Sequence, residues 1–453
     1  MMNVLVIGQG AREHAIVWKL AQSPKVSRLY CAPDNPGVAA VRGAECVPIA
    51  ATDFDALIQF AEQHDVDLTV VGPETPLIAG IVDAFEAKGL RVFGPSAEPA
   101  QLEGSKVFAK QLMQNYNIPT ADFVVHSDFD QATAYAREYF AANPGKKLVV
   151  KVDGEAAGKG VIVCPTLAEA EEALTRILID KAFGSAGDQV VLEEGLEGFE
   201  ISLMAFTDGA TVVPMLPAQD HKRVLDGDQG PNTGGMGCYA PVPFVGAELI
   251  ERATETVLRP AVAAIRDTGL PYKGVIYAGL MVMPEGDIKV IEFNARFGDP
   301  EAEVVLPLLE TDLADLLIGV TDAHLDEVQV TWREGVAVCV VMASGGYPGA
   351  YEKGYPVEGI EHVTHLSDVV LFQAGTAFND QGQVVTNGGR VLTVTGIGTD
   401  FAQARGRTYA AAGALHFENA HYRTDIGYQA LANEAIGDGQ PEDEGDEDFD
   451  FEE

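Results

Sequence analysis

Short apolar runs alternate with stretches of helical periodicity over roughly the first hundred residues, and this alternation restricts the possible folds more than any other feature of the chain. Short apolar runs bounded by glycine or polar residues are typical of buried strands, whereas apolar residues recurring every three or four positions indicate helices. Strands are expected at residues 4–7, 29–31, 46–49, 68–71 and 91–93, and helices at 12–22, 54–64 and 78–88. Strands joined through helices require right-handed crossovers, so we expect a parallel sheet in an N-terminal α/β domain.

The spacing of the apolar runs changes after residue 105. Helices are expected at 106–116, 168–179 and 247–267, and strands at 149–152, 160–163, 189–193, 200–205, 274–283 and 288–294. Runs of strands with separate helices are typical of an α+β fold with a mainly antiparallel sheet. A third segment opens after residue 319, with strands expected at 336–342 and 391–395 and a helix at 401–415. It contains few charged clusters and is interpreted as a packing domain.

The chain is strongly acidic, with 30 Lys and Arg against 68 Asp and Glu and a formal net charge of −38. Such a charge repels phosphate backbones and anionic lipid, so we expect neither nucleic acid nor a membrane as a partner. A local cluster of donors can still bind a small phosphorylated molecule. Residues 438–453 contain ten acidic residues and no basic one, and a solvated tail is expected there.

The cysteines and the N-terminus indicate a compartment. The five cysteines are odd in number, widely spaced and without a Cys-x-x-Cys pair, which argues against a disulfide framework or a zinc cluster. The chain starts without the basic and apolar regions of a signal peptide, and no apolar stretch reaches the roughly 18 residues of a membrane-spanning helix. We therefore expect a cytoplasmic protein.

Two glycine-rich segments could each contact phosphate. Gly8 and Gly10 lie where the first strand turns into the first helix, whose N-terminus offers free N–H groups. Glu13 stands where a dinucleotide fingerprint needs its third glycine, so the alternatives are a phosphate site or a tight βα turn. The second segment, 151–160, lies between two expected strands and lacks the Walker pattern. It is either a mobile flap whose lysines neutralise a triphosphate or an ordinary hairpin turn.

Two later segments are rich in charged residues. The acidic residues at 193–200 could accept hydrogen bonds from an adenine amine or a ribose hydroxyl, or could form a solvated turn. The eighteen residues from Asp220 to Gly237 are dense in Gly, Asp, Lys and Arg. Such a stretch cannot be core, because its polar groups would lack partners, and it is longer than a plain connection. We interpret it as the lining of a functional site.

The last strand expected before the third segment carries the sharpest signal. Residues two apart in a strand face the same side, so Glu292 and Asn294 are expected to project together while Ile291 and Phe293 point into the core. A carboxylate and an amide oxygen are hard ligands suited to Mg²⁺, which takes few protein ligands beside phosphates and water. Arg296 could pair with a carboxylate or a phosphate. The alternative is a polar strand end fixed by a salt bridge.

Five motifs complete the pattern. They are VGPETPL at 71–77, GPS at 94–96, AAGKG at 156–160, QDHKRVLDGDQGPNTGGMG at 219–237 and NARFGDPE at 294–301. Together they resemble the phosphoribosylamine–glycine ligase family of the ATP-grasp superfamily, over about residues 3–430. The resemblance implies an N-terminal α/β domain at 1–104, an ATP-grasp domain at 105–325 with a lid at about 122–195, a C-terminal domain at 326–433, and an acidic, disordered tail at 434–453.

The resemblance also implies an activity. The expected reaction is the ATP-dependent ligation of glycine to 5-phosphoribosylamine through a glycyl phosphate, which gives glycinamide ribonucleotide, ADP and phosphate in purine synthesis. ATP and Mg²⁺ (or Mn²⁺) are the expected cofactors, the partners are small molecules only, and the enzyme is expected to be a monomer. Another ATP-grasp carboxylate–amine ligase is the alternative.

Individual roles follow from the same resemblance. Residues expected to be catalytic are Arg296, Asp220 and Lys222. Residues expected to bind ATP are Lys106, Lys151, Gly154, Gly158, Lys159, Gly160, Glu193 and Glu200. Residues expected to bind the other substrates are Gly10, Arg12, Glu74, Gly230, Pro231, Asn232, Thr233, Gly234, Gly235 and Asp299. Residues expected to ligate the metal are Glu292 and Asn294.

Four positions depart from the usual pattern of the family. Ala11 replaces a glycine, Glu155 replaces a leucine, Phe199 replaces a glutamate, and Glu303 stands where a glutamine is common. None of these removes an expected ligand. Glu155 and Glu303 are expected to add negative charge near an anionic site and thereby to affect affinities rather than the reaction.

Overall fold

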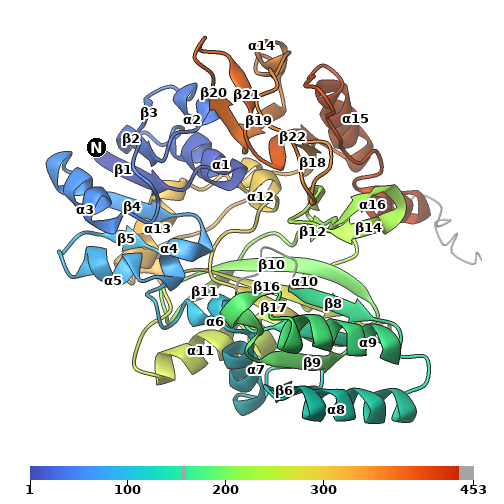
Figure 1. Ribbon diagram of the computed structural model, residues 1–453. Helices are drawn as coiled ribbons and strands as arrows, with labels where there is room; N and C mark the ends of the chain where they lie inside the picture. Colours follow the sequence, from blue (N-terminus) through green and yellow to red (C-terminus); the bar gives the residue numbers. More distant parts are fainter. Residues whose placement is uncertain (155–159, 438–453) are drawn as a thin grey trace, which may run out of the picture.

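The N-terminal sheet is parallel, as the alternation of strands and helices predicts (Figure 1). The computed structural model describes residues 1–154 and 160–437 of the chain. The sheet order is β3-β2-β1-β4-β5, formed by Ala44–Cys46, Val26–Ala32, Met2–Ile7, Leu68–Val71 and Val92–Phe93. Val4 and Val6 pack into one hydrophobic cluster and Leu5 and Ile7 into another. Both faces of the strand are therefore covered, which explains why it is a continuous apolar run.

The helices of this region are α1 (Ala11–Leu20), α2 (Pro36–Ala39), α3 (Phe54–Gln63), α4 (Glu74–Ile78), α5 (Ile81–Glu86) and α6 (Gln101–Gly104). Two predicted boundaries are wrong. The strand expected at 46–49 ends at Cys46, because its partner β2 ends one residue beyond the Cys31–Cys46 pair. The single helix expected at 78–88 is divided between α4 and α5, because Gly80 adopts a positive φ of 91°.

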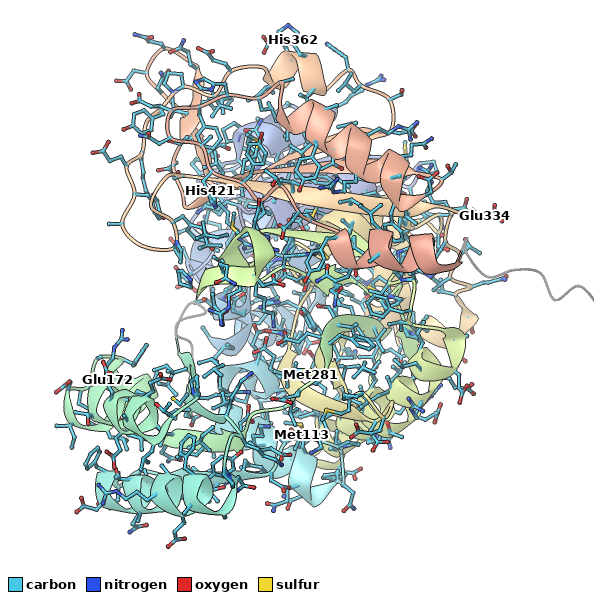
Figure 2. All side chains as sticks on the ribbon, turned by 90° about the vertical axis from the view of Figure 1, so that its right-hand side faces the viewer. Met113, Glu172, Met281, Glu334, His362 and His421 are labelled. Atoms are coloured by element: carbon cyan, nitrogen blue, oxygen red, sulfur yellow. The ribbon has the colours of Figure 1, made fainter. Side chains whose placement is uncertain are left out.

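Two antiparallel sheets follow. Both have four strands. The sheet with more residues in its strands, here called the larger sheet, has the order β11-β10-β16-β17, formed by Val212–Pro214, Phe199–Thr207, Gly274–Val282 and Ile288–Asn294. The smaller has the order β6-β9-β7-β8, formed by Phe123–His126, Val190–Glu194, Leu148–Val152 and Val161–Cys164. The smaller sheet packs with α8 (Phe129–Ala142) and α9 (Leu167–Leu174) around a separate hydrophobic cluster. In Figure 2 this unit, with Glu172 on α9, stands to one side of the larger body around Met281.

Helices connect and cover the larger of these sheets. α7 (Lys106–Asn115) precedes the smaller sheet. The long helix expected at 247–267 is observed as one continuous helical run, made of α10 (Ala247–Ala253), a π turn (Thr254–Leu258) and α11 (Arg259–Asp267). α12 (Ala302–Leu308) and α13 (Leu313–Thr321) lead to the last part of the chain.

The C-terminal sheet includes two strands from the middle of the chain. Its order is β12-β15-β18-β22-β19, formed by Gln219–Asp220, Gly237–Ala240, Val336–Ala343, Arg390–Gly398 and Val369–Gln373. β12 and β15 flank the loop singled out in the sequence, and β15 pairs with β18 over four residue pairs. The C-terminal segment is therefore more than the packing domain that the sequence predicts, because its sheet holds both ends of that loop.

Smaller elements complete the C-terminal part. They are the hairpins β13–β14 (Arg223–Leu225, Gln229–Asn232) and β20–β21 (Thr376–Phe378, Val384–Thr386), and the helices α14 (Ile360–Val363), α15 (Phe401–Ala412) and α16 (Tyr428–Gly437). Residues 434–437, expected to belong to a disordered tail, are thus helical, and the rest of that tail lies outside the described residues. None of the helices in residues 1–154 and 160–437 has the length and apolar character needed to span a membrane.

Candidate functional site

Three lysines from different elements surround Glu292 on β17. Lys151 lies near the end of β7, Lys106 begins α7, and Lys222 follows β12. The Nζ of Lys151 donates to the carbonyl of Ile291 at 3.0 Å, and the Nζ of Lys222 lies 3.8 Å from Oε1 of Glu292. Burial alone raises the pKa of Glu292, but Lys222, Lys151 and Lys106 lower it by more, so the carboxylate is ionised at neutral pH. In a chain of net negative charge, this cluster brings three ammonium groups to one place, which suits a polyphosphate.

Lys106 is fixed at the N-terminus of α7. Ser105 caps the helix by accepting a hydrogen bond from the N–H of Phe108 at 3.0 Å, and its hydroxyl donates to Asp153 at 2.9 Å. The Nζ of Lys106 donates to the carbonyl of Gly154 at 3.1 Å, and burial lowers the pKa of this lysine. The start of the predicted flap is therefore tied to the helix that carries a predicted ATP ligand.

The rest of the predicted flap can be placed only in part. Gly160 accepts a hydrogen bond from the N–H of Val152 at 2.9 Å and so closes the hairpin between β7 and β8. Gly158 and Lys159, expected to bind ATP, and Glu155, a departure from the family pattern, lie outside the described residues.

Glu193 on β9 is enclosed by two lysines. Its carboxylate pairs with the ammonium groups of Lys110 and Lys151, and all three side chains are buried. Burial lowers the pKa of Lys110 to about 8, although Glu193 opposes the change. The sequence places Glu193 beside a nucleoside, whereas in the structure its carboxylate orients two lysines. Glu200, the other acidic residue of that segment, pairs with Lys222 at 3.1 Å.

A β-bulge lies next to Glu292. In the pairing of β17 with β16, Val290 and Glu292 occupy successive positions, and Ile291 is the extra residue. Val290 and Phe293 are buried, whereas Ile291 is partly exposed and its carbonyl accepts the hydrogen bond from Lys151. The prediction that Ile291 points into the core is wrong, because the bulge breaks the two-residue period of the strand.

Asn294 lies beyond the bulge, two residues from Glu292 in the regular part of the pairing, so the two share one side of β17 as predicted. The Oδ1 of Asn294 accepts a hydrogen bond from Nη2 of Arg296 at 3.1 Å. The same nitrogen donates to Glu103 at 2.7 Å, and the other carboxylate oxygen of Glu103 accepts from the N–H of Ala295 at 2.7 Å. Glu103 therefore fixes the main chain and the arginine that follow the predicted metal ligands.

Arg12 and Glu74, from the N-terminal α/β region, lie beside Arg296. Nε of Arg296 donates to Oε2 of Glu74 at 3.3 Å, and Nη1 of Arg12 lies 3.8 Å from that oxygen. Burial alone would raise the pKa of Glu74, but Arg296 and Arg12 lower it to about 2. Arg12 also donates to the carbonyl of Phe297 at 3.2 Å. Two guanidinium groups and an ionised carboxylate thus meet at the junction of β17 with the N-terminal sheet.

The first glycine-rich turn is filled by a side chain of its own helix. The N–H of Gly10 donates to Oε2 of Glu13 at 2.6 Å, which forms a capping box at the start of α1. The turn is therefore a tight βα turn, and this amide is not free for the phosphate that the sequence allows. Gly10 still lines the site, because a Cβ on it would lie 3.5 Å from Oδ2 of Asp299.

The loop after Asp220 packs against the segment that follows β17. The Oδ1 of Asp220 is buried without a hydrogen-bond partner among the described residues, and burial followed by the charge of Glu301 raises the pKa of Asp220. Glu301 is held by the hydroxyls of Ser202 at 2.8 Å and Tyr277 at 2.7 Å. Gly235 has a φ of 113°, and a Cβ on it would lie 2.6 Å from Oδ1 of Asp220.

The predicted substrate residues before Gly235 have different positions. Gly230, Pro231 and Asn232 form β14 of the β13–β14 hairpin. Thr233 donates to the carbonyl of Lys222 through both its N–H and its hydroxyl, at 2.8 Å each. Thr233 thereby closes the loop on the residue that carries the lysine beside Glu292.

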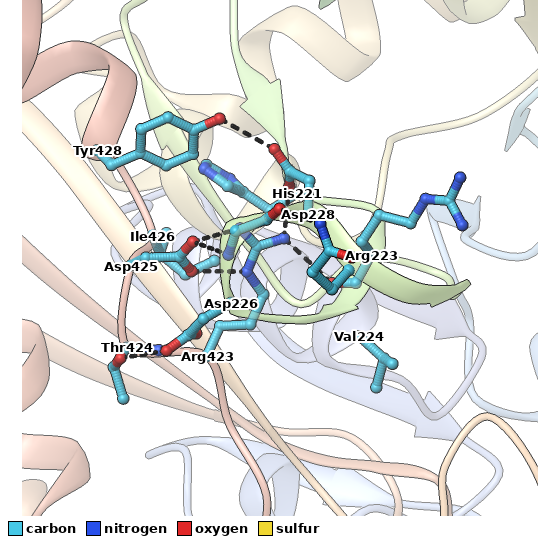
Figure 3. A network of polar contacts seen from close by, with 12 residues as sticks. His221, Arg223, Val224, Asp226, Asp228, Arg423, Thr424, Asp425, Ile426 and Tyr428 are labelled. Carbon is cyan, nitrogen blue, oxygen red and sulfur yellow. Dashed lines mark hydrogen bonds and ion pairs between the residues drawn. The ribbon is translucent and has the colours of Figure 1, made fainter.

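The tip of the loop is anchored by a buried arginine (Figure 3). The Arg423 side chain is fully buried and pairs with Asp425 and with Asp228, at 2.7 Å in each case. Asp226 accepts a hydrogen bond from the N–H of Thr424 at 2.8 Å. The sequence analysis interprets the whole loop as the lining of a functional site. In the structure, Asp226 and Asp228 instead attach the hairpin to the C-terminal segment.

Glu303 does not add the negative charge that the sequence suggests. It lies on α12 with no measurable exposure, and neither carboxyl oxygen has a hydrogen-bond partner among the described residues. Burial, followed by the nearby charge of Asp299, raises the pKa of Glu303 well above its ordinary value. Burial therefore favours the neutral carboxylic acid, which is close in shape to glutamine.

Several residues of the site could not be found from sequence patterns. Glu103, Lys110 and Arg423 carry no local motif, and only the folded chain brings them to their partners. Arg390 also binds this region, through Gly234 and Asp299. Its one sequence signal is the glycine pair that precedes it.

The donor set at β17 suits a hard divalent cation. Glu292 provides an ionised carboxylate and Asn294 an amide oxygen on the same side of the strand. No group of three or more His, Cys, Asp or Glu residues that could hold a metal occurs in the part of the chain that the structure describes. Two oxygen donors from the protein match the preference of Mg²⁺ for phosphates and water in its remaining positions.

Comparison with known proteins first defines a class. The ATP-grasp (A) domain of phosphoribosylglycinamide synthetase matches residues 104–302, and the N and C domains of the same enzyme match residues 2–103 and 337–429. The fold is also that of a biotin carboxylase domain from Hydrogenobacter thermophilus, with a TM-score of 0.72 at 16% identity over 93% of this chain and 92% of that one. The chain therefore has the ATP-grasp architecture.

Closer relatives define the family. Phosphoribosylamine–glycine ligase from Nostoc sp. is 49% identical over 94% of this chain and 99% of its own length, and that from Escherichia coli K12 is 46% identical over 96% and 100%. The crystal structure of phosphoribosylamine–glycine ligase from Thermotoga maritima aligns with a TM-score of 0.79 at 34% identity, covering 93% of this chain and 99% of that one. The chain belongs to the phosphoribosylglycinamide synthetase family.

Proposed function

We propose that this chain catalyses the reaction for which its relatives are named. It joins glycine to 5-phosphoribosylamine with ATP and gives glycinamide ribonucleotide, ADP and phosphate in purine synthesis. The observation that carries the proposal is the cluster of Lys106, Lys151 and Lys222 around an ionised Glu292. Relatives of the same name along nearly the whole chain support this activity over that of another ATP-grasp carboxylate–amine ligase.

The chemistry requires activation of a carboxylate. A carboxylate is a poor electrophile, so an oxygen of glycine attacks the γ-phosphorus of ATP, ADP leaves, and glycyl phosphate forms. The amine of phosphoribosylamine then attacks the acyl carbon, its nitrogen loses a proton, and phosphate leaves with the bridging oxygen. Phosphoryl transfer needs positioning and charge neutralisation more than covalent help, which Lys106, Lys151 and Lys222 can supply.

The second cluster suits the other substrates. Glycine and phosphoribosylamine carry two amines, a carboxylate and a phosphate between them, and both signs of charge meet in one region, on Arg12, Arg296, Glu74 and Asp299. Gly234 and Asp299 bind the same nitrogen of Arg390, and Gly235 packs against Asp220 and Pro300. Holding an acyl phosphate and an amine together can contribute about 7–11 kcal/mol at best.

Remaining roles are proposed on the same basis. Glu292 and Asn294 would hold a divalent cation, which when bound neutralises charge on the phosphates of ATP. Glu193 would act by orienting Lys110 and Lys151, and Glu200 by orienting Lys222. The choice between Mg²⁺ and Mn²⁺, the monomeric state, the cytoplasmic location, the direct contacts of Gly154 and Gly160 with ATP, and the domain limits at 104, 325 and 433 stay predictions.

The direct test is substrate-dependent turnover of ATP. Release of phosphate is measured with ATP and glycine, with and without freshly generated phosphoribosylamine, and the organic product is identified by mass. We expect phosphate and glycinamide ribonucleotide in equal amounts, and only when all three substrates are present. Equal ATP turnover with another carboxylate or another amine in place of these substrates would favour a different ligase of the same fold.

A further inference from the structure

Both polar groups of one residue in the loop, Gly234, are bound by side chains of the C domain (residues 337–429). The N–H of Gly234 donates to the hydroxyl of Tyr347 at 3.0 Å, and the carbonyl of Gly234 accepts from Nη1 of Arg390 at 2.6 Å. The two side chains come from different elements, since Tyr347 follows β18 and Arg390 begins β22. The conformation of Gly234 is therefore fixed from outside its own loop.

The same guanidinium holds a second segment of the site. Nη1 of Arg390 donates to the carbonyl of Asp299 at 2.8 Å and pairs with its carboxylate at 3.1 Å. A Cβ on Gly234 would lie 3.1 Å from Cζ of Arg390, so the glycine backbone rests closely on the guanidinium. Arg390 thus connects the loop that follows Asp220 to the segment that follows β17.

Glycines beside Arg390 keep it in place. A Cβ on Gly389 would collide with Cδ2 of the Tyr347 ring, so only glycine allows the tyrosine to pack there. Ser344 donates through its N–H to the carbonyl of Gly389 at 2.7 Å and through its hydroxyl to that of Gly388 at 2.8 Å. Arg390 and Tyr347, here called the clamp, are therefore held in place by the C domain itself. Their hydrogen bonds go to Gly234 and Asp299 rather than to the lysine cluster.

We propose that Arg390, assisted by Tyr347, is a positioning residue for the non-nucleotide substrates. It sets the spacing between the Gly234 backbone and Asp299, and the carboxylate of Asp299 lies beside Gly10. The inference rests on the proposed function only in naming those substrates as glycine and phosphoribosylamine. It assigns to the C domain a part in substrate binding that acts through Gly234 and Asp299, with no part in binding ATP.

The kinetic test separates the three Michaelis constants. Arg390→Gln removes the donor fork, and Tyr347→Phe removes one hydroxyl without changing the packing. A hydrogen bond with a charged partner contributes about 1.5–3 kcal/mol, so we expect the KM of glycine or phosphoribosylamine to rise by about tenfold or more in Arg390→Gln, with the KM of ATP unchanged. Tyr347→Phe should give a smaller rise of the same KM.

Arg407→Gln is the matched control. Arg407 also lies in the C domain, where it binds the carbonyl of Ile397 and pairs with Asp368 at 3.4 Å, but it touches neither Gly234 nor Asp299. We expect all three KM values to stay within twofold or so of the parent in this variant. A loss of kcat in Arg390→Gln with every KM unchanged would indicate a merely structural role and would overturn the proposal.

Amide hydrogen exchange tests the clamp independently of turnover. Peptides covering residues 226–237 should exchange faster in Arg390→Gln and in Tyr347→Phe than in the parent. Their exchange rate in Arg407→Gln should equal that of the parent. This holds even if the parent fails the ligation assay, so failure of the proposed function and failure of the clamp are distinguishable. Unchanged exchange in both clamp variants would show that Gly234 is not held by these side chains.

Discussion

Glu292 is an ionised carboxylate held among lysines, and its charge serves two purposes. It compensates Lys222, Lys151 and Lys106 in the free protein, and it is one of two oxygen donors suited to a divalent cation. Replacing Glu292 by glutamine keeps the shape of the side chain and removes its charge. The loss of charge compensation is measured by Tm, and the loss of a metal ligand by the Mg²⁺ requirement.

For Glu292→Gln we expect kcat to fall by about 10²-fold or more, which corresponds to roughly 2.7 kcal/mol of transition-state stabilisation, and the Mg²⁺ requirement to rise. Because the lysines lower the pKa of Glu292, its ionised form also stabilises the fold above the unfolded pKa, so Tm should fall moderately at neutral pH. The measurement is a Mg²⁺ titration of kcat.

Glu200→Gln is the control, because it removes the other carboxylate partner of Lys222. This variant should not shift the midpoint of the Mg²⁺ titration. An equal shift in both variants would contradict metal ligation by Glu292.

Glu303 gives a second prediction at this scale, because its folded-state pKa is raised while its unfolded-state pKa is about 4.3. The folded state binds the proton more tightly, so the parent loses stability from this group as pH rises above that unfolded pKa. Glu303→Gln has no such proton to lose. We expect the Tm of the variant minus the Tm of the parent to increase as the pH rises above about 4.3, the unfolded-state pKa. A difference that is constant over this range would show that Glu303 is not held neutral.

At the scale of elements, the sequence predicts best what local periodicity determines. The strand expected at 288–294 is β17, and Glu292 and Asn294 share a side as predicted. The bulge at Ile291 was not predictable, because it depends on how β17 pairs with β16 and not on the order of apolar residues. The hydrogen bond from the N–H of Gly10 to Glu13 was also not predictable from the sequence, because the carboxylate of Glu13 could equally have faced solvent.

Two glycines of the Asp220–Gly237 loop form a pair for testing this element. Gly227 and Gly235 both have positive φ, of 66° and 113°. Alanine reaches the first conformation at a cost of about 1–2 kcal/mol, whereas the second lies outside the left-handed helical region and strains alanine more. A Cβ at position 227 meets no atom within 4 Å, whereas one at position 235 collides with Asp220 and Pro300. We expect Gly235→Ala to lower kcat/KM by about 10²-fold and Gly227→Ala to leave it within a few-fold. Equal losses would mean that the close packing at Gly235 has no part in the site.

At the scale of the whole molecule, four sheets supply the site, and the smaller antiparallel sheet brings Lys151 and Glu193. The N-terminal sheet brings Arg12 and Glu74, the larger antiparallel sheet brings Glu292 and Asn294, and the C-terminal sheet holds both ends of the loop after Asp220. The sequence predicts a parallel sheet followed by antiparallel pairing, and it names residues such as Arg12, Glu74 and Arg296 that the structure brings together. It could not predict that β12 and β15 join the C-terminal sheet, because strand partners nearly a hundred residues apart have no local signature.

The central claim, that this assembled site activates the carboxylate of glycine as an acyl phosphate, is tested by the fate of the carboxylate oxygen. Glycine labelled with ¹⁸O in both carboxyl positions is converted with ATP and phosphoribosylamine, and the released phosphate is analysed by mass. The account predicts one labelled oxygen in each phosphate, because the oxygen that attacks ATP leaves with the phosphoryl group when the amine attacks the acyl carbon. Phosphate that carries no label while glycinamide ribonucleotide accumulates would contradict it.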